Sequence, residues 1–315
     1  MYMYIMKRLG FMILAIFVVS AMAFFLMNMV PGSTPVMILK YTVLGLENSA
    51  TPNQIAQISS RYNLNDPLYV QYITWLKNAL LHGNIGTSYI YNEPVSYLIA
   101  LRLPATILLA VTSMSIAILI GIPLGIYAAL KENRISDTIL RFVTLFGVSM
   151  PSFWVALILL LIFAVDLKLV PVVGYGQVDN IILPSITLAI PYMAIIIRVT
   201  RTSMLETLGN EYIRFSIAKG LSKYRIIFVH ALKNAMLPII TVLGFQTGNL
   251  LGGAMIVETI FDWPGIGNLL VNSIDSHDIP VVQGCILVIA IMFLTVNFIV
   301  DILYTYIDPR IRYGG

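Results

Sequence analysis

The side chains that could do chemistry are few and scattered along this 315-residue sequence. His82, His230 and His277 fall in three separate segments, so a shared catalytic or metal site for them is not expected. His277 stands between Asp275 and Asp278, which could begin a metal site, but a bound metal would need two more convergent ligands. We therefore predict no catalytic residue and no metal ligand.

Sequence motifs for catalysis are also missing. The chain has no G-x-x-x-x-G-K-[ST] loop to cradle phosphates, no H-E-x-x-H pair and no serine in a G-x-S-x-G turn. Without a phosphate-binding loop the chain cannot itself hydrolyse ATP. We predict that the protein is not an enzyme and that it binds no cofactor of its own.

One segment concentrates charge in an otherwise apolar chain. From Arg198 to Lys233, 36 residues interleave basic and acidic side chains with apolar ones. Gly220 interrupts this helix-prone segment, and Ser222 can cap the helix that follows. The pattern predicts two helical arms joined at a glycine corner, which suits entry into a groove on another protein. The alternative is a surface helix held by anionic membrane lipid.

The remaining composition indicates a membrane protein. The chain is 58% hydrophobic and 11% charged, with a mean hydropathy of +0.87. A helix needs roughly 20 apolar residues to cross a ~30 Å hydrocarbon core. Six runs without Asp, Glu, Lys or Arg meet or approach this length, which predicts an all-α polytopic membrane protein with six transmembrane helices. The runs are about 9–30, 103–130, 142–165, 180–197, 234–257 and 279–300.

The fourth run is the shortest, and it contains two prolines. Pro184 and Pro191 each remove a backbone donor from a helix. We therefore expect a kinked or irregular fourth helix.

Basic residues orient the six crossings. Fourteen of the 19 lie on the side that holds the N-terminus and five lie opposite, so the positive-inside rule places both termini in the cytoplasm. The net charge of +4 divides into +8 inside and −4 outside, which reflects membrane topology and not nucleic-acid binding. We predict a multi-pass protein of the cell membrane.

The chain divides into three parts on this reading. Residues 1–102 hold the first helix and a long external segment, 31–102. Residues 103–306 hold the other five helices and the cytoplasmic loop 198–233, and residues 307–315 form a cytoplasmic tail.

The external segment is predicted to be partly helical. Thr51, Pro52 and Gln54 form a capping box at the start of one short helix. Asp66 before Pro67 predicts the capped start of a second. These helices either cap the bundle or form a docking surface for a delivery protein.

Three glycines in the fifth crossing are spaced by four. Gly244, Gly248 and Gly252 therefore share one helix face, where another helix can approach closely. We assign them to helix packing.

Charged side chains are missing from the middle of every crossing, and polar ones are few. An uncharged polar group at that depth needs a partner or a wet cavity. We assign Ser149, Gln246 and Asn249 to a translocation path, with helix-to-helix hydrogen bonds as the alternative. Proton-coupled carriers keep an ionisable relay at mid-membrane, so uphill transport by this chain would draw its energy from elsewhere.

The run EYIRFSIAKGLSKYRIIFVHALKNAMLPIIT resembles the cytoplasmic signature of ABC-importer permeases in the branch for dipeptides, oligopeptides and nickel. The glycine of that signature corresponds to Gly220, the preceding pair to Ala218 and Lys219, and the closing proline to Pro238. The likeness continues through ATPNQIA, NDPLYVQY, GTSY, LGGAMIVETIFDWPGIGNLL and DILYTYIDPRIRYGG, so it covers nearly the whole chain.

The sequence departs from the family pattern in a few places. The Glu-Ala-Ala of the general signature reads Arg214-Phe215-Ser216, and the spacing from the glycine to the proline is longer, as in this branch. Outside that signature, a PGDP-like site reads PGSTP and a Gly-Asp pair reads Gly83-Asn84. These outer changes weaken any inference about the substrate.

The resemblance implies a coupling helix that seats in a cleft of a separate cytoplasmic ATPase. Two such ATP-binding subunits would hold ATP and Mg, and their closure would drive this chain and a second homologous permease subunit. An external solute-binding protein would deliver the solute, and this chain is similar to the first of the two permeases. The coupling residues would be Arg214, Ala218, Lys219, Gly220, Leu221 and Ser222.

The substrate is open at this point. Peptides are the family's usual cargo, and oligosaccharides or nickel are alternatives because relatives carry them. From a different class, a stand-alone secondary carrier or channel also fits six helices, although we find no internal repeat that would favour one. A structural membrane subunit that transports nothing would not need the polar residues of the fifth crossing.

Overall fold

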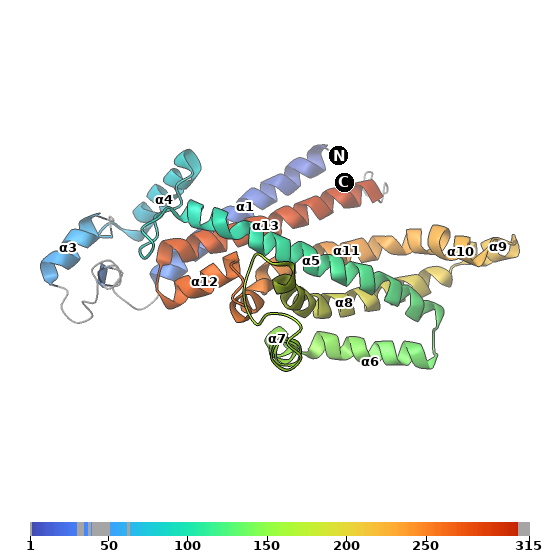
Figure 1. Ribbon diagram of the computed structural model, residues 1–315. Helices are drawn as coiled ribbons and strands as arrows, with labels where there is room; N and C mark the ends of the chain where they lie inside the picture. The colour runs from blue at the N-terminus through green and yellow to red at the C-terminus, as the bar shows by residue number, and fades with distance from the viewer. Residues whose placement is uncertain (1, 30–34, 37–38, 40–50, 62–63, 308–315) are drawn as a thin grey trace. The chain divides into compact units, whose positions relative to one another are not determined.

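The fold is a set of helices. The computed structural model describes residues 2–29, 35–36, 39, 51–61 and 64–307. Over these residues the named elements are all helical, as Figure 1 shows, which confirms the prediction of an all-α protein. Most of the external stretch 31–50 and the tail from residue 308 onward lie outside the described residues.

The elements are α1 (Tyr2–Asn28), α3 (Pro52–Arg61), α4 (Leu68–His82), α5 (Val95–Leu130), α6 (Ile135–Ser149), α7 (Ser152–Leu159), η1 (Leu160–Asp166), α8 (Val178–Leu208), α9 (Glu211–Ala218), α10 (Lys223–Arg225), η2 (Ile226–Ala231), α11 (Leu232–Ile260), α12 (Ile266–Asp275) and α13 (Ile279–Ile307). The two η elements are π-helical stretches continuous with their neighbours.

Five helices in the described part of the chain are long and apolar enough to cross a membrane, and a bent pair adds a sixth crossing if it forms one span. Most of these helices are longer than the apolar runs that predicted them: α5 begins at Val95 and α8 ends at Leu208. Charge-free runs mark only the apolar part of a helix, whereas backbone hydrogen bonding continues beyond it. The spans are Ile5–Asn28, Val95–Leu130, Val178–Leu208, Lys223–Gly252 and Ile279–Ile302, with Ile135–Ser149 and Ser152–Asp166 as the bent pair.

The prediction of one unbroken third helix over 142–165 is wrong. The helix stops at Ser149 and restarts at Ser152, and the two pieces are bent by 104°. Met150 (φ −75°, ψ 128°) and Pro151 (φ −61°, ψ 136°) are both extended. Proline disfavours the α conformation of the residue before it and offers no backbone N–H, so the chain turns there.

The fourth crossing is regular where an irregular helix was expected. The α-helix α8 continues through both Pro184 and Pro191. Pro184 is the seventh residue of the helix, so it removes one intrahelical hydrogen bond, as Pro191 does. Half of the membrane-spanning window of α8 is buried against other helices, and this packing holds the helix together across the bond missing at Pro191.

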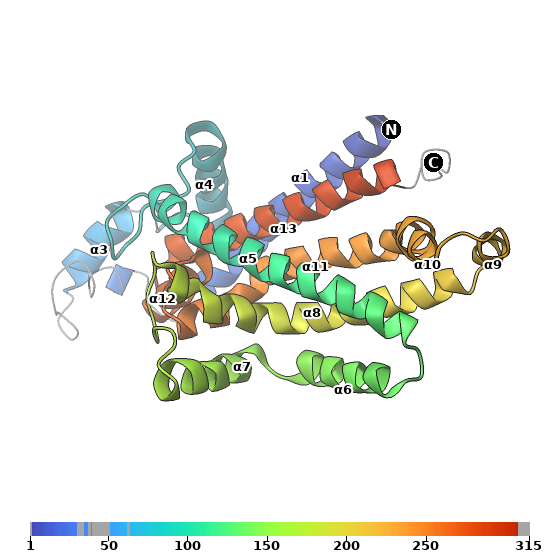
Figure 2. The same cartoon turned by 45° about the vertical axis from the view of Figure 1, so that its right-hand side comes forward.

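Contacts divide the chain into two compact units. Unit 1 comprises residues 1–9, 107–263 and 292–315, and unit 2 comprises residues 10–106 and 264–291. Within unit 1, α8 packs against α6, α7 and α11, and Figures 1 and 2 both show α8 lying alongside α11.

Small residues allow α5 to approach α8 within unit 1. A Cβ at Gly125 would lie 2.5 Å from the Cβ of Thr200, and a Cβ at Gly121 would lie 2.9 Å from Cγ2 of Ile196. Neither glycine could therefore carry a side chain without separating the two helices. This close approach is what their four-residue spacing indicates.

Unit 2 has an aromatic centre around Tyr72. The Tyr72 ring stacks on Trp75 at 6.1 Å and meets the edge of Phe24 at 5.4 Å, and its hydroxyl is 2.9 Å from the hydroxyl of Ser20. Tyr72 is 6% exposed, so its polar atom needs this partner. The ring cluster joins α4 to α1.

The start of α3 follows the predicted capping box. The helix begins at Pro52, and the backbone N–H of Thr51 donates to Oε1 of Gln54 at 3.0 Å. The start of α4 differs from its prediction. Pro67 is the residue that precedes the helix, and no side chain caps it, so Asp66 does not serve as the helix cap.

Candidate functional site

The charged segment folds into a helix, a glycine corner and a second helix. Gly220 has φ +75°, a left-handed conformation that ends α9. The N–H of Gly220 donates to the carbonyl of Ile217 at 2.9 Å, and the N–H of Leu221 donates to that of Ser216 at 3.3 Å. This pair of bonds is a Schellman motif. The predicted corner is therefore built by the glycine itself.

Ser222 starts the next helix, as the sequence predicts. The backbone N–H of Arg225 donates to its hydroxyl oxygen at 3.4 Å, and the N–H of Ile226 donates to its carbonyl at 3.0 Å. We call residues Glu211–Arg225 the α9–α10 turn. Its helix stop and helix start are separated only by Gly220 and Leu221.

The inner face of the α9–α10 turn packs against α8 and α11 within unit 1. Ile213 is 1% exposed, and together with Ile226 and Ile227 it joins a cluster that includes Met204 of α8 and Ala235 of α11. Such packing makes the turn part of the same body as these two long helices.

A polar contact supports the same attachment. The side-chain amide of Asn234 donates to the hydroxyl of Tyr212 at 2.9 Å, which links α11 to α9. The turn is therefore attached to both α8 and α11.

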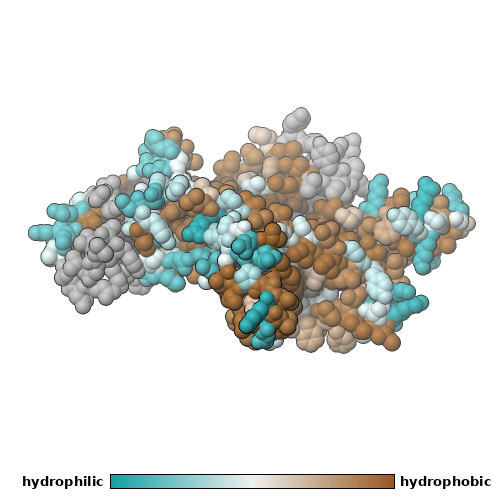
Figure 3. Space-filling model, in the orientation of Figure 1, coloured by the Kyte–Doolittle hydropathy of each residue, from teal (hydrophilic) through white to brown (hydrophobic). Residues whose placement is uncertain are grey.

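The opposite face of the turn is open. Phe215, Ile217 and Tyr224 are 61%, 59% and 71% exposed. The Lys219 ammonium lies 4.5 Å from the centroid of the Phe215 ring. Figure 3 shows hydrophilic side chains gathered at this end of the α8–α11 pair, next to hydrophobic ones.

The six residues assigned to coupling by resemblance all lie in this turn. Leu221 is partly buried and packs on the cluster beneath the turn, which the hydrophobic contact of a Schellman motif requires. The other five, Arg214, Ala218, Lys219, Gly220 and Ser222, are exposed.

The residues assigned to a translocation path are not all brought together. Gln246 is 8% exposed on α11, and its Oε1 lies 3.5 Å from Nδ2 of Asn249, one turn further along. This contact is long for a hydrogen bond, and Asn249 is partly buried. Ser149 is exposed at the last residue of α6.

The three glycines of α11 differ in their surroundings. A Cβ at Gly244 would overlap the side chain of Val300, and one at Gly248 would lie 3.0 Å from the ring of Phe293. Both contacts are with α13, within unit 1. A Cβ at Gly252 would meet no atom of the described residues within 4 Å. The packing role stays a prediction, supported by contacts at the first two positions.

The sequence reasoning missed a buried ion pair between α6 and α8. Asp137 has no exposed surface, and Arg201 binds it in a fork, with Nε 2.6 Å from Oδ1 and Nη2 2.8 Å from Oδ2. The N–H of Asn133 also donates to Oδ2 at 3.1 Å. In sequence these are ordinary charges at the ends of crossings, 64 positions apart, and nothing in their spacing pairs them.

A second buried carboxylate, in unit 2, was also missed. Asp278 has no exposed surface and accepts from the Ser88 hydroxyl at 2.5 Å and from the N–H of Tyr89 at 3.1 Å. Burial raises the pKa of Asp278, against the lowering effect of these hydrogen bonds. From the sequence, this acid was considered only as a neighbour of His277 in a possible metal site.

The elements around Asp278 carried a signal that could have been used. Ile266, Leu269, Leu270 and Ser273 repeat at helical spacing in the same loop, and all four are buried on α12. The loop is therefore a packed helix. The backbone N–H of Ile266 donates to Oγ1 of Thr106 at 2.8 Å, which ties α12 to α5.

Two family descriptions match the chain. Residues 121–313 match the binding-protein-dependent transport system inner membrane component, and residues 1–110 match the N-terminal part of such a membrane component. The first match alone covers more than half of the chain.

Individual relatives match over nearly their full length. The chain is 42% identical to a dipeptide transport system permease protein of Alkalihalophilus pseudofirmus, over 98% of this chain and 99% of that protein. It is 38% identical to the dipeptide transport system permease protein of Escherichia coli (strain K12), over 99% of each. It is also 38% identical to a glutathione transport system permease protein of Salmonella choleraesuis, over 98% of this chain and 99% of that protein.

These matches agree with the spanning helices, the missing phosphate-binding loop and the glycine corner. The chain belongs to the family of binding-protein-dependent transport system inner membrane components, the permease subunits of ABC transporters.

Proposed function

We propose that this chain is one of two permease subunits of an ATP-driven importer of short peptides. The observation that carries the proposal is the α9–α10 turn, which is anchored on α8 and α11 and open on its other face. The relatives are described as permeases for dipeptides and for glutathione, which is itself a peptide, and this supports the substrate class.

The α9–α10 turn would receive force from an ATP-binding subunit. Exposed Phe215 and Tyr224 offer apolar anchors, and Arg214 and Lys219 offer charge at the rim, a combination that suits a groove on a folded partner. Since Ile213 and Ile226 pack beneath the turn, a push on its open face moves α8 and α11 together. The complete transporter would also contain two ATP-binding subunits, a second permease subunit and an external binding protein.

The orientation follows from charge. The α9–α10 turn lies in the most basic connection of the chain, so it belongs in the cytoplasm with both termini. The opposite connections, which include α3, α4 and α12, then face outward. Gln246 and Asn249, the polar residues of α11, would line the path between the two sides, and Ser149 would contribute from α6.

Substitution of Gly220 tests the proposal. A side chain here meets no described atom within 4 Å, so within this chain the effect of a substitution comes from the backbone conformation. A β-branched residue disfavours φ +75° by roughly 1–2 kcal/mol, whereas asparagine tolerates it. We expect Gly220→Val to reduce ATP-dependent peptide uptake by about tenfold, the factor that 1.4 kcal/mol gives, and Gly220→Asn to stay near wild type.

The assay uses the complete transporter in sealed vesicles, with peptide uptake and ATP hydrolysis measured separately. Uncoupling by Gly220→Val, with membrane insertion unchanged, is the expected result. Equal uptake by the two variants would contradict the role of the corner. Peptide flux through the purified chain alone, without ATP or partners, would instead support a stand-alone carrier.

A further inference from the structure

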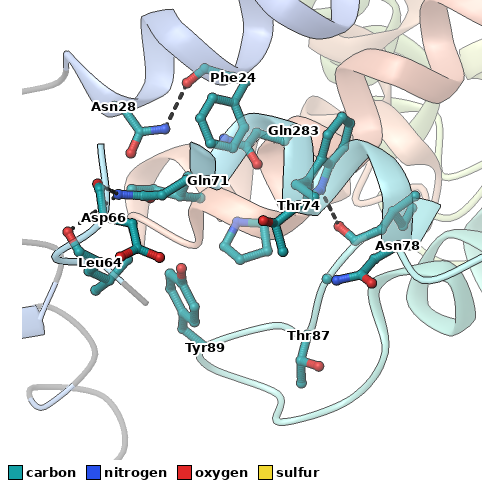
Figure 4. A pocket seen from close by; sticks show the side chains of 15 residues that line it. Phe24, Asn28, Leu64, Asp66, Gln71, Thr74, Asn78, Thr87, Tyr89 and Gln283 are labelled. Carbon is teal, nitrogen blue, oxygen red and sulfur yellow. Dashed lines mark hydrogen bonds between the residues drawn. The ribbon is translucent and has the colours of Figure 1, made fainter. Parts of the chain in front are cut away.

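A cavity in unit 2 is lined by apolar side chains and by several polar ones, among them a carboxylate. Its volume is about 290 Å³, the size of a small-molecule site. Figure 4 shows side chains converging on it from α1, α4 and α13. Its described lining includes one carboxylate, Asp66, several amides and hydroxyls, and no Lys or Arg.

The amides of two lining residues already use their donors elsewhere. Nδ2 of Asn28 donates to the carbonyl of Phe24 at 2.8 Å. Nε2 of Gln71 donates to the backbone carbonyl of Asp66 at 2.8 Å and to that of Leu64 at 3.3 Å. These bonds orient the two amides and use both N–H groups of Gln71 and one of Asn28. The two amide oxygens, which only accept, remain available to a ligand, together with the second N–H of Asn28.

The Asp66 carboxylate is available as well. It precedes α4 but does not cap the helix, since α4 has no side-chain cap. Among the described lining residues it is the one formal charge, so the cavity carries a negative charge without a compensating cation. A site of this kind attracts a positively charged group that donates several hydrogen bonds.

Gln283 contributes a further polar group to the cavity. Its side chain is 5% exposed, and it lines the cavity from α13. Nothing in the part of the chain that the structure describes hydrogen-bonds to its amide. The Gln283 side chain borders the cavity, so a bound polar molecule could hydrogen-bond to its amide.

We propose that this cavity binds the amino-terminal ammonium of a short peptide. The ammonium would lie against the Asp66 carboxylate and the amide oxygens of Asn28 and Gln71, and the Gln283 amide would hydrogen-bond to the peptide backbone. Trp75 and Phe24 supply apolar wall for a side chain. This inference rests on the proposed function for the substrate class, and it adds a substrate-binding site on the outward side of the chain.

The test measures binding to the full chain alone, in lipid nanodiscs, by equilibrium dialysis. The probes are radiolabelled dialanine and N-acetyl-dialanine, which lacks the ammonium. We expect acetylation and Asp66→Asn each to weaken binding by about tenfold, the scale of a lost charge-assisted hydrogen bond. Gln283→Leu should weaken it too. Glu93→Gln is the matched control, since it removes an exposed acid of the same unit that does not line the cavity, and it should bind as wild type does.

Three results would overturn the proposal: no dialanine binding by the wild-type chain, equal binding of the acetylated peptide, or unchanged binding by Asp66→Asn. Monodispersity on size exclusion shows that each variant is folded. Dialanine uptake by the complete transporter is measured as well, because it distinguishes failure of the proposed binding site from failure of the proposed function. If the complete transporter takes up dialanine but the cavity does not bind it, the proposed function stands and the proposed binding site is rejected.

Discussion

Two carboxylates, Asp137 of unit 1 and Asp278 of unit 2, are both fully buried but are satisfied in different ways. Asp137 is held by a guanidinium, Arg201, through two short bonds. Among the described residues, the donors to Asp278 are neutral, namely the Ser88 hydroxyl and backbone N–H groups. A buried charge needs compensation, and the two units supply it from different chemistry.

The difference shows what each carboxylate does for its unit. The Asp137–Arg201 pair joins α6 to α8 next to the connection from α5, so it holds a piece of the broken third crossing in place. Asp278 organises a loop. Ser88 donates to it and accepts from the N–H of Tyr91 at 2.9 Å, which fixes the turn before α5 to the start of α13. The Asp137 site holds two helices together, and the Asp278 site fixes the conformation of a loop.

Removing the cation should have the largest effect. Arg201→Met leaves the buried Asp137 carboxylate with the N–H of Asn133 and the more distant guanidinium of Arg141, whose Nε is 3.7 Å from Oδ2. Loss of the fork to Arg201 should lower the free energy of unfolding by about 3 kcal/mol, the low end of the range for breaking a buried pair. Thermal unfolding in detergent, followed by circular dichroism, measures the loss. The double variant Asp137→Leu with Arg201→Met should recover most of it, because no charge is then buried. A single variant as stable as wild type would show that water reaches the carboxylate.

Removing a neutral donor should have an intermediate effect. Ser88→Ala takes one hydrogen bond from the Asp278 carboxylate and should cost about 1–3 kcal/mol. The single cysteine, Cys285, is fully buried in the same unit, so its rate of reaction with a fluorogenic maleimide reports opening of unit 2. Labelling should be faster in Ser88→Ala than in Ser60→Ala, an exposed serine of α3. Equal rates would mean that backbone donors alone satisfy the carboxylate.

An exposed ion pair should matter least. Nη1 of Arg8 lies 3.1 Å from Oδ2 of Asp301, but the Arg8 side chain is 47% exposed. Pairs of this kind contribute about 0–1 kcal/mol and are screened by salt. Arg8→Gln should therefore change the unfolding temperature little, and less in high salt than in low salt. A loss as large as that of Arg201→Met would contradict the ranking by burial.

Local features of the fold were accessible from the sequence. The spanning helices follow from apolar runs, and the glycine corner follows from Gly220 and Ser222. The break at Pro151 was not predicted, although the prolines of α8 were given weight. Whether a proline interrupts a helix or is accommodated within it depends on the packing around it. A single sequence does not reveal that packing.

The candidate functional sites also differ in whether the sequence could locate them. The α9–α10 turn could be located because its signal is local, a Schellman stop followed by a serine cap. The cavity around Asp66 could not, since Asn28, Gln71 and Gln283 come from three helices far apart in sequence. The prediction that Asp66 caps α4 even pointed to a different use for that carboxylate.

The sequence by itself determined which segments leave water and where the charged corner lies, because transfer free energy and helix capping depend on residues that are close in the chain. Tertiary structure alone decided the partners of the buried polar groups. Asp137 meets Arg201 across 64 positions and Ser88 meets Asp278 across 190. The environment of a side chain is made by whatever the fold brings to it, so the same residue type is a solvated charge in one place and a buried anchor in another.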